Sequence, residues 1–262
     1  VLRLEGLQAG VTGCNACMRT LSHIDATCPY IGSVLCCLNV RSNLSDIHVT
    51  SYCITFGMET SLLVAPQFNI APGQTILVVR QNAVQQPDSV LFIGANSRLG
   101  KGFAIGQKLI NARAETVADK PSFRDAYRKR CCLVPVSGFY QWNTVGRVKN
   151  PYYFRRKDCE LFALAGLWER WEGRTTAQII QTCTILTTAA NPLVSSVHHR
   201  MPVVIDKPDI PQWLDANRDS AHLLATSNWP AFKAFAVSAH VNNTNNDDPD
   251  CIKSAEDTLS LF

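Results

Sequence analysis

The 262-residue sequence predicts an α+β fold, in which a mainly antiparallel, curved or barrel-like sheet is accompanied by a few helices. Short β-branched or apolar runs bounded by Gly, Pro or Asp recur along the chain, and such runs are typical of strands. They cover residues 75–80, 89–93, 132–136, 139–142, 152–154, 162–168, 183–187, 202–205 and 235–237. Turn-forming residues at 143–146 and 172–173 separate neighbouring runs and indicate reversals of the chain.

Two short segments predict helices. The first begins at Pro121 and carries Phe123 and Tyr127 four residues apart, so both aromatic rings share one helical face. The second begins at Pro211 and includes Trp213, which we expect to be buried. Proline is favoured in the first turn of a helix, because the N–H groups of that turn have no hydrogen-bond partner within the helix.

The chain divides into two regions of different pattern. Residues 1–60 show no clear amphipathic period, and we expect an irregular segment there that is aberrant or removed by processing. Residues 61–262 carry the strand and helix signals and form the predicted domain. The polar, turn-rich stretch at 242–248 lies near its end.

The composition narrows the class of protein. Hydrophobic residues make up 46% of the chain, which is enough for a buried core, and no apolar run of membrane-spanning length occurs. The first residues do not resemble a secretion signal, so we expect a protein that is not secreted. Eleven cysteines, an odd number in a large chain, favour free thiols over a disulfide framework.

Positive charge is concentrated in one segment. Residues 120–157 contain ten Lys or Arg and a single acid, Asp125, whereas the net charge of the whole chain is only +4. Such a concentration suits a polyanionic partner such as a nucleic acid. A solvated basic face is the alternative, and charge alone does not decide between them.

One cysteine-rich stretch resembles part of a zinc site. Cys14 and Cys17 form a single CxxC pair, with His23 and Cys28 following. A structural zinc site normally needs a second pair of ligands at matching spacing, so this signal is weak. We therefore predict no metal and no cofactor.

Several motifs resemble, in order, those of the SOS response-associated peptidase (SRAP) family. They are Phe-Asn-Ile-Ala-Pro at 68–72, Asn-Ala-Arg-Ala-Glu-Thr at 111–116, Gly-Phe-Tyr-Gln-Trp at 138–142, His-His-Arg-Met-Pro at 198–202, and a closing segment from 237 to 249. Any one of them is weak evidence, but the ordered series makes chance similarity improbable. The resemblance covers residues 66–252.

The resemblance implies a reaction with abasic sites in single-stranded DNA. An N-terminal cysteine offers an α-amine, whose pKa of about 7.7–8.0 leaves part of it neutral and nucleophilic at cellular pH. The amine forms an imine with the open-chain sugar aldehyde, and the thiol then closes a thiazolidine ring. The product is a stable DNA–protein crosslink. The same terminus is implied in the peptidase activity, which removes the initiator Met or a short leader.

The resemblance also assigns roles to particular residues. Asn111 matches the residue that positions the amine and the sugar, and Arg113 matches the one that binds the adjacent phosphate. His198 matches the proton shuttle, and Gln141 stands where the family has a glutamate that acts as general acid–base. With the basic segment, the predicted DNA-binding residues are Asn69, Arg113, Arg124, Arg128, Lys129 and Arg130.

Two departures from the family pattern concern the chemistry directly. It begins at Val1, and the cysteine whose context best matches the family's start is Cys17, followed by Met-Arg-Thr. Cys36 and Cys37 have more usual spacing to the next motif but lack the context, and Cys53 is a fainter match. In addition, Gln141 is an amide, which cannot exchange a proton near neutral pH.

Three functions remain open from the sequence. The leading hypothesis is an abasic-site crosslinking protein, monomeric, with reduced activity, located in the cytoplasm at the nucleoid or in the nucleus. The second is a catalytically inactive single-stranded-DNA-binding module. The third is a thiol peptidase, which requires an internal cysteine within reach of His198.

Overall fold

A computed structural model describes residues 35–38, 66–82, 86–94, 110–172, 179–225 and 232–255, with the backbone alone at 35–38 and 89–94. The zinc-like stretch and Cys17 lie outside these ranges. In the described part of the chain, none of the helices has the length and apolar character needed to cross a membrane.

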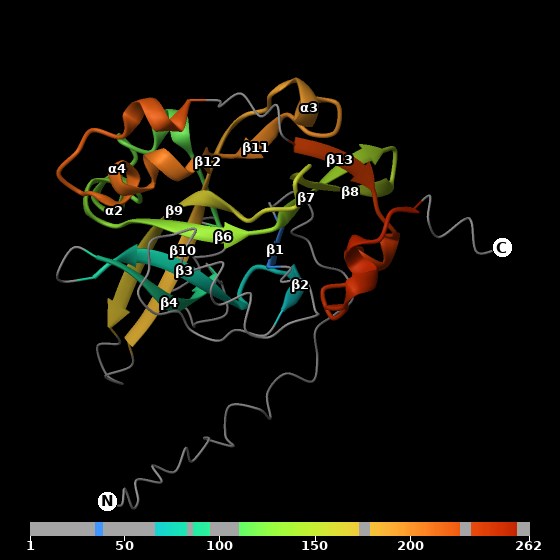
Figure 1. Cartoon of the computed structure of the whole chain (residues 1–262), viewed down its shortest axis with the longest axis horizontal. Coiled ribbons are helices and arrows are strands. Elements are labelled where there is room, and N and C mark those ends of the chain that lie inside the picture. Colours follow the sequence, from blue (N-terminus) through green and yellow to red (C-terminus); the bar gives the residue numbers. More distant parts are fainter. Residues whose placement is uncertain are drawn as a thin grey trace, which may run out of the picture.

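One sheet has five strands in the order β13-β8-β7-β1-β2. Its strands are β1 (Leu35–Leu38), β2 (Gln67–Ile70), β7 (Gly138–Val145), β8 (Val148–Arg156) and β13 (Phe232–Ala236). All of their pairings are antiparallel. β1 lies between β7 and β2, so residues 35–38 belong to the sheet although the sequence predicted an irregular segment there (Figure 1).

The second sheet is larger and contains eight strands. They are β3 (Thr75–Gln81), β4 (Pro87–Gly94), β5 (Asn111–Arg113), β6 (Cys131–Val136), β9 (Phe162–Glu172), β10 (Ile179–Ala189), β11 (Arg200–Pro202) and β12 (Val204–Ile205). Among the described strands, β10 pairs in parallel with β4 and β5, and the remaining pairings are antiparallel. Gly166 of β9 pairs with both β6 and β10, so β9 has a partner along each edge.

The helices are few and short. They are α2 (Arg124–Lys129), α3 (Pro192–Ser195) and α4 (Ile210–Leu214), together with 3₁₀ turns η2 (Ala114–Thr116), η3 (Lys207–Asp209), η4 (Ala221–Leu224), η5 (Ala239–Asn242) and η6 (Pro249–Ile252). Trp213 of α4 is fully buried, and its Nε1 donates to Cys132 O of β6 at 2.8 Å. This buried bond attaches α4 to the larger sheet, beside α2 (Figure 1).

The predicted α+β class is confirmed. Each run predicted as a strand lies in or overlaps a strand, and both predicted helices form, as α2 and α4. The run at 202–205 is divided between β11 and β12, because Val203 pairs through its backbone with Leu186 and Ala165 instead of continuing one strand.

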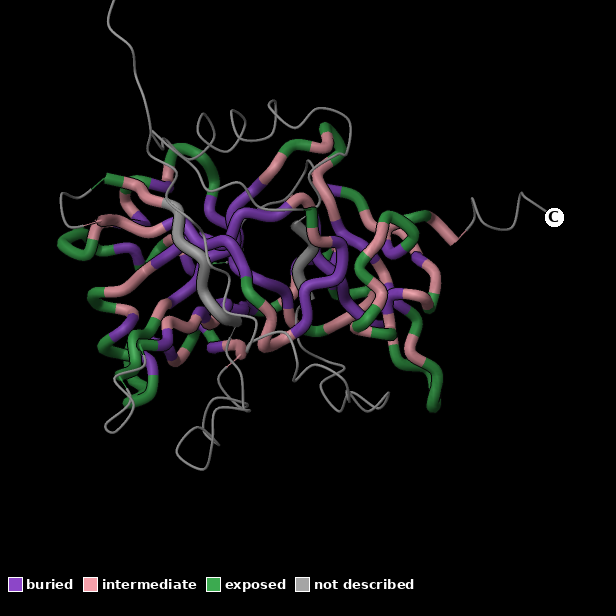
Figure 2. Tube along the Cα trace, turned by 90° about the horizontal axis from the view of Figure 1, so that it is seen from below, coloured by how far each residue is buried: buried purple, intermediate pink, exposed green. Residues whose placement is uncertain are grey.

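Strand β7 separates two apolar clusters. Phe139 pairs with Phe154 of β8, and these stacked rings, 5.0 Å apart, face the larger sheet. Tyr140 pairs with Tyr153, and this pair faces the C-terminal segment. Successive side chains of a strand point to opposite faces, so one strand serves both cores. Buried positions accordingly run through the centre of the molecule, as Figure 2 shows.

Gly138, at the start of β7, provides a test of this packing. A Cβ atom there would overlap the ring and hydroxyl of Tyr153, which is 2% exposed and held between Tyr140 and Phe235. We expect Gly138→Ala to lower the free energy of unfolding by about 1–3 kcal/mol, the usual cost of overpacking. Urea denaturation measures it.

The exposed Val145, at the other end of β7, gives the control. Val145→Ala should stay within about 0.5 kcal/mol of the parent, as surface substitutions usually do. Equal stability of Gly138→Ala and Val145→Ala would contradict the close approach of Tyr153.

Candidate functional site

Strand β10 brings two of the sequence motifs side by side. On one side it pairs with β5, so that Thr187 lies opposite Arg113. On the other side it pairs with β11, so that Ala189 lies opposite Arg200. Residues 111–113 and 200–202, far apart along the chain, are therefore one strand apart in the sheet.

The Arg200 side chain joins these strands. Its Nη1 and Nη2 donate to the two carboxylate oxygens of Glu115, at 2.6 and 2.9 Å, and Nη2 also contacts Thr187 Oγ1 at 3.3 Å. The Arg200 side chain is only 18% exposed. A bidentate pair of charged groups is stronger and more directional than a neutral hydrogen bond. The hydrogen bond from Arg200 lowers the pKa of Glu115, which keeps the carboxylate charged.

The backbone of Arg200 holds the ring of His198. Nδ1 of His198 lies 3.1 Å from the Arg200 N–H and 3.0 Å from the Arg200 carbonyl oxygen. A neutral ring can accept from the N–H, and a ring protonated at Nδ1 can donate to the carbonyl. Either tautomer of the His198 ring therefore has a partner at Nδ1.

Gln141 reaches the same carbonyl from the other sheet. It is 1% exposed on β7, and its Nε2 donates to Arg200 O at 3.2 Å. Its Oε1 and the Oδ1 of Asn111 are buried atoms that lack a hydrogen-bond partner among the described residues. A buried polar atom without a hydrogen-bond partner lowers the stability of the fold, because its desolvation is not compensated. In native proteins such an atom often marks a functional position.

Three motif segments therefore meet at Arg200. Glu115, from the Asn-Ala-Arg-Ala-Glu-Thr motif, binds its side chain, whereas His198 and Gln141 bind its backbone. Asn111 lies nearby on β5, opposite Ile185 of β10. The arrangement offers two unpaired oxygens, an imidazole that can exchange a proton and an exposed Arg113 within one region.

The predicted DNA-binding residues occupy different environments. Arg113, Arg124, Arg128 and Lys129 are exposed. Arg130 is engaged internally, because its Nη2 contacts Glu169 at 2.6 Å and its Nε donates to Trp168 O at 3.2 Å. The positive charge of the 120–157 segment is thus partly neutralised within the protein.

Asn69 is completely buried. Its Nδ2 donates to the carbonyl oxygens of Val241, Asn243 and Asn246 at 2.9–3.1 Å, and its backbone N–H donates to Asp247. These bonds hold the C-terminal segment against β2. A DNA contact by Asn69 stays a prediction, and its surroundings indicate a structural role.

Strand β1 places two cysteines beside the site in the register of the sheet. Cys36 lies opposite Phe139 and Cys37 opposite Gly138, on the strand that carries Gln141. The sequence favoured Cys17, which lies outside the described residues. The cysteines with the more usual spacing are therefore the ones whose backbone lies next to β7.

Burial suppresses the nucleophilic character of two neighbouring cysteines on β6. Burial raises the pKa of Cys131 to about 12 and raises that of Cys132 as well. Only the thiolate is a good nucleophile, so these thiols are inert near neutral pH. Among the described side chains, the thiol that lies in a cluster with a histidine is Cys251, beside His240 and not His198.

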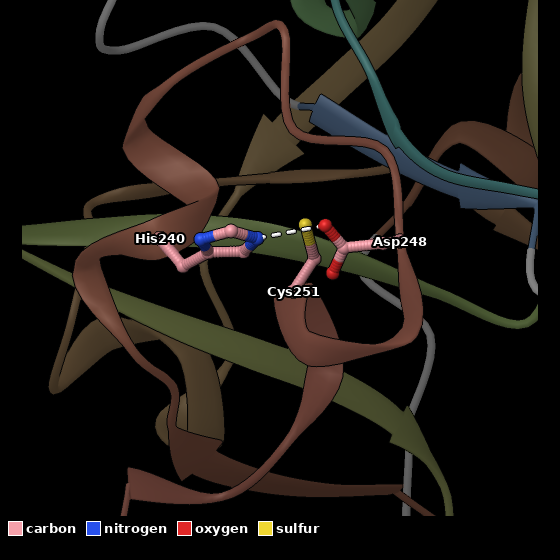
Figure 3. A group of neighbouring side chains, drawn as sticks. All are labelled: His240, Asp248 and Cys251. Atoms are coloured by element: carbon pink, nitrogen blue, oxygen red, sulfur yellow. Dashed lines mark hydrogen bonds and ion pairs between the residues drawn. The ribbon is translucent and has the colours of Figure 1, made fainter.

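Figure 3 shows this cluster of His240, Asp248 and Cys251, whose potential ligand atoms lie within 4.8 Å of one another. Asn246 Nδ2, a donor only, contacts Nδ1 of His240 at 3.0 Å, so Nδ1 accepts and the proton lies on Nε2. That Nε2 donates to Asp248 at 2.9 Å. A histidine binds a metal through its unprotonated nitrogen, and here that nitrogen, Nδ1, is already occupied by Asn246. The hydrogen bonds of this cluster stabilise the C-terminal segment.

Comparison with known proteins identifies the family. The sequence profile of the SOS response associated peptidase (SRAP) family matches residues 39–244. The chain belongs to this family. The SRAP chain is 34% identical to the abasic site processing protein YoqW of Bacillus subtilis (strain 168) over 205 residues, which cover 72% of this chain and 86% of that protein.

Other relatives agree with this assignment. The abasic site processing protein HMCES of Gallus gallus is 31% identical over 226 residues, covering 73% of this SRAP chain and 67% of that protein. A solved structure from Bacteroides thetaiotaomicron superposes with a TM-score of 0.65 at 25% identity, covering 72% and 85%. A Bordetella bronchiseptica structure gives a TM-score of 0.63 at 23% identity, and this likeness supports the fold alone.

Sequence reasoning missed the residues that connect the site. Glu115 and Arg200 lie inside two of the family motifs, yet their pairing joins positions 85 residues apart. The available signal was the presence of one acidic and one basic residue in two separate motifs. Thr187 carried no signal, because a threonine in a strand is ordinary.

Replacing Glu115 tests the Arg200 junction. The folded-state pKa of Glu115 is lowered, so its stabilisation is present above the ordinary glutamate pKa and lost as the pH falls through the lowered value. We expect Glu115→Gln to lower the melting temperature at pH 7, with the difference from the parent shrinking toward acidic pH. Calorimetry over a pH series measures it.

Glu172→Gln is the matched control, because Glu172 pairs with Arg170 on an exposed part of β9. It should change the melting temperature little, as exposed ion pairs contribute little. A pH-independent loss in Glu115→Gln would contradict the role given to its charge.

Proposed function

We propose that this SRAP chain processes abasic sites in single-stranded DNA by forming a covalent crosslink to the opened sugar. The observation that carries the proposal is the convergence of His198, Gln141 and Glu115 on Arg200, with Asn111 beside them on β5. The names of the relatives YoqW and HMCES agree with an abasic-site substrate.

The proposed reaction has two steps. The α-amine of an N-terminal cysteine adds to the sugar aldehyde and loses water, which forms an imine. The sulfur of the same cysteine then adds to the imine carbon while the nitrogen takes up a proton, and a thiazolidine ring results. Each step moves a proton, so a group with two accessible protonation states accelerates it.

Each site residue has a separate role in this reaction. The unpaired Oδ1 of Asn111 is available to accept from the amine or a sugar hydroxyl. His198 transfers protons at the sugar oxygens through Nε2, since Nδ1 is held by the backbone of Arg200. The exposed Arg113 binds the adjacent phosphate, a geometry that guanidinium matches with two bonds.

Gln141 limits the rate of this chain. It can orient the imine by hydrogen bonds, but an amide does not donate or remove a proton near neutral pH. Loss of a general acid–base typically lowers a rate by about 10²–10⁴-fold. The function is therefore proposed as crosslinking at reduced rate.

The identity of the nucleophile is a separate question. Cys17 has the family-like context, whereas Cys36 and Cys37 have backbones adjacent to β7. Whichever acts must have its α-amine free. Intact mass and N-terminal sequencing of the natively expressed protein identify the residue at the mature start.

A second candidate function is a DNA-binding module without chemistry. The observation that favours it is the buried amide of Gln141 in place of a carboxylate. Binding would depend on Arg113 and the exposed cations of α2, and affinity would fall steeply with salt because phosphate contacts release counterions. A monomer acting on DNA in the nucleoid or nucleus fits either candidate.

A denaturing gel separates the two candidates. We expect the natively processed protein, incubated with an oligonucleotide that contains one abasic site, to give a slowly migrating covalent band. His198→Asn should reduce its rate of formation by about 10²-fold or more. An oligonucleotide without the lesion is the control. If no band forms even when borohydride traps the imine, the binding module is favoured.

Restoring the carboxylate tests the role of position 141. Gln141→Glu should raise the rate of crosslinking by about 10²-fold, because it returns a proton-exchanging group to the same place. Single-turnover kinetics measure the rate. Gln141→Met, which keeps the size but neither bonds nor exchanges protons, is the control. Equal rates for Gln141→Glu and the parent would remove the acid–base argument.

A further inference from the structure

A hollow lies over β8 and β13, on the face of the five-stranded sheet that is opposite to Gln141. It has a volume of about 590 Å³, and its walls include Tyr153, Arg155, Lys233, Phe235 and Lys253. Tyr153 points to this face with Tyr140, whereas Gln141 faces the larger sheet. The hollow is therefore distinct from the site described above.

The register of β7, β8 and β13 determines which side chains border the hollow. Residues directly opposite each other on antiparallel strands point to the same face. One row across β7, β8 and β13 is Gly138, Arg155 and Lys233. The next row on that face is Tyr140, Tyr153 and Phe235. Because Gly138 has no side chain, the ring of Tyr153 occupies the space beside it, and this ring lines the hollow together with Arg155 and Lys233.

The hollow is positively charged. It contains three cations, and no carboxylate belongs to its described lining. Lys253 is paired with Asp250 at 2.5 Å, so its charge is largely compensated. Lys233 is exposed, and Nε of Arg155 is buried without a hydrogen-bond partner within the described chain. Arg155 and Lys233 are thus left to attract an anion.

An aromatic ring lies beside these cations. The guanidinium of Arg155 is 5.6 Å from the centroid of the Phe235 ring, and Nζ of Lys233 is 6.0 Å from it. Phe235 is only partly buried. Cations next to an accessible aromatic ring are the combination that binds a phosphate together with a base in single-stranded nucleic acids.

We propose that this hollow binds a nucleotide, with its phosphate on Arg155 and Lys233 and its base against Phe235. The same chemistry serves a free nucleoside monophosphate and a nucleotide within a DNA strand. The site goes beyond the proposed crosslinking function and does not depend on it. An acidic peptide matches the charge but not the ring.

The test uses the whole chain and purified probes. Isothermal titration with AMP, adenosine and inorganic phosphate is compared for the parent, Arg155→Met and Arg147→Met. Arg147→Met removes one charge from an exposed position at the β7–β8 turn and is the matched control. Circular dichroism checks that each variant is folded.

The expected result is saturable binding of AMP, weaker binding of adenosine, and a loss of about tenfold or more in Arg155→Met alone. Phe235→Leu should weaken AMP but not phosphate. In parallel, fluorescence anisotropy with an unlesioned single-stranded oligonucleotide identifies the source. A loss there in Arg155→Met assigns the site to the DNA strand, and unchanged oligonucleotide affinity assigns it to a free nucleotide.

Three outcomes overturn the proposal. They are the absence of saturable binding of both AMP and the oligonucleotide, equal losses in Arg155→Met and Arg147→Met, and displacement of AMP by a glutamate-rich peptide at equal concentration. Crosslinking to an abasic site at saturating DNA should be unaffected by Arg155→Met. A failed crosslinking assay with intact AMP binding would therefore reject the proposed function and leave this site standing.

Discussion

The arrangement of the site depends on one arginine. The guanidinium of Arg200 binds Glu115 beyond β5, and its backbone binds both His198 and Gln141. A charged, bidentate contact has a narrow range of favourable geometries, especially when the arginine is largely shielded from water. Since the same residue pairs in β11 with β10, the side-chain bonds and the sheet register constrain each other.

The two faces of strand β7 pack against different parts of the molecule. Phe139 and Gln141 face the larger sheet, where the motif residues gather, whereas Tyr140 and Tyr153 face the C-terminal segment. Tyr140 donates from its hydroxyl to Phe68 O at 2.8 Å and so joins β2 to this second cluster. The five-stranded sheet therefore has the candidate reaction site on one face and the cationic hollow on the other.

Paired and unpaired polar groups occur in both regions. Around the C-terminal segment, Nδ2 of Asn69 contacts three carbonyls and His240 contacts Asp248 and Asn246, while Oδ1 of Asn69 has no partner among the described residues. At the junction of the sheets, the buried oxygens of Asn111 and Gln141 also lack partners among the described residues. Paired groups specify structure, and unpaired ones are available to a ligand.

The sequence by itself determined the secondary structure and the chemical types at the site. Alternation, β-branched runs and proline positions act within a few residues, so strands such as β3 and helices such as α4 were predictable. Tertiary structure alone decided that Glu115 meets Arg200, that Asn69 is buried, and that Arg155 lies beside Phe235. These contacts join residues far apart along the chain, and they follow from strand order and register, which local patterns do not encode.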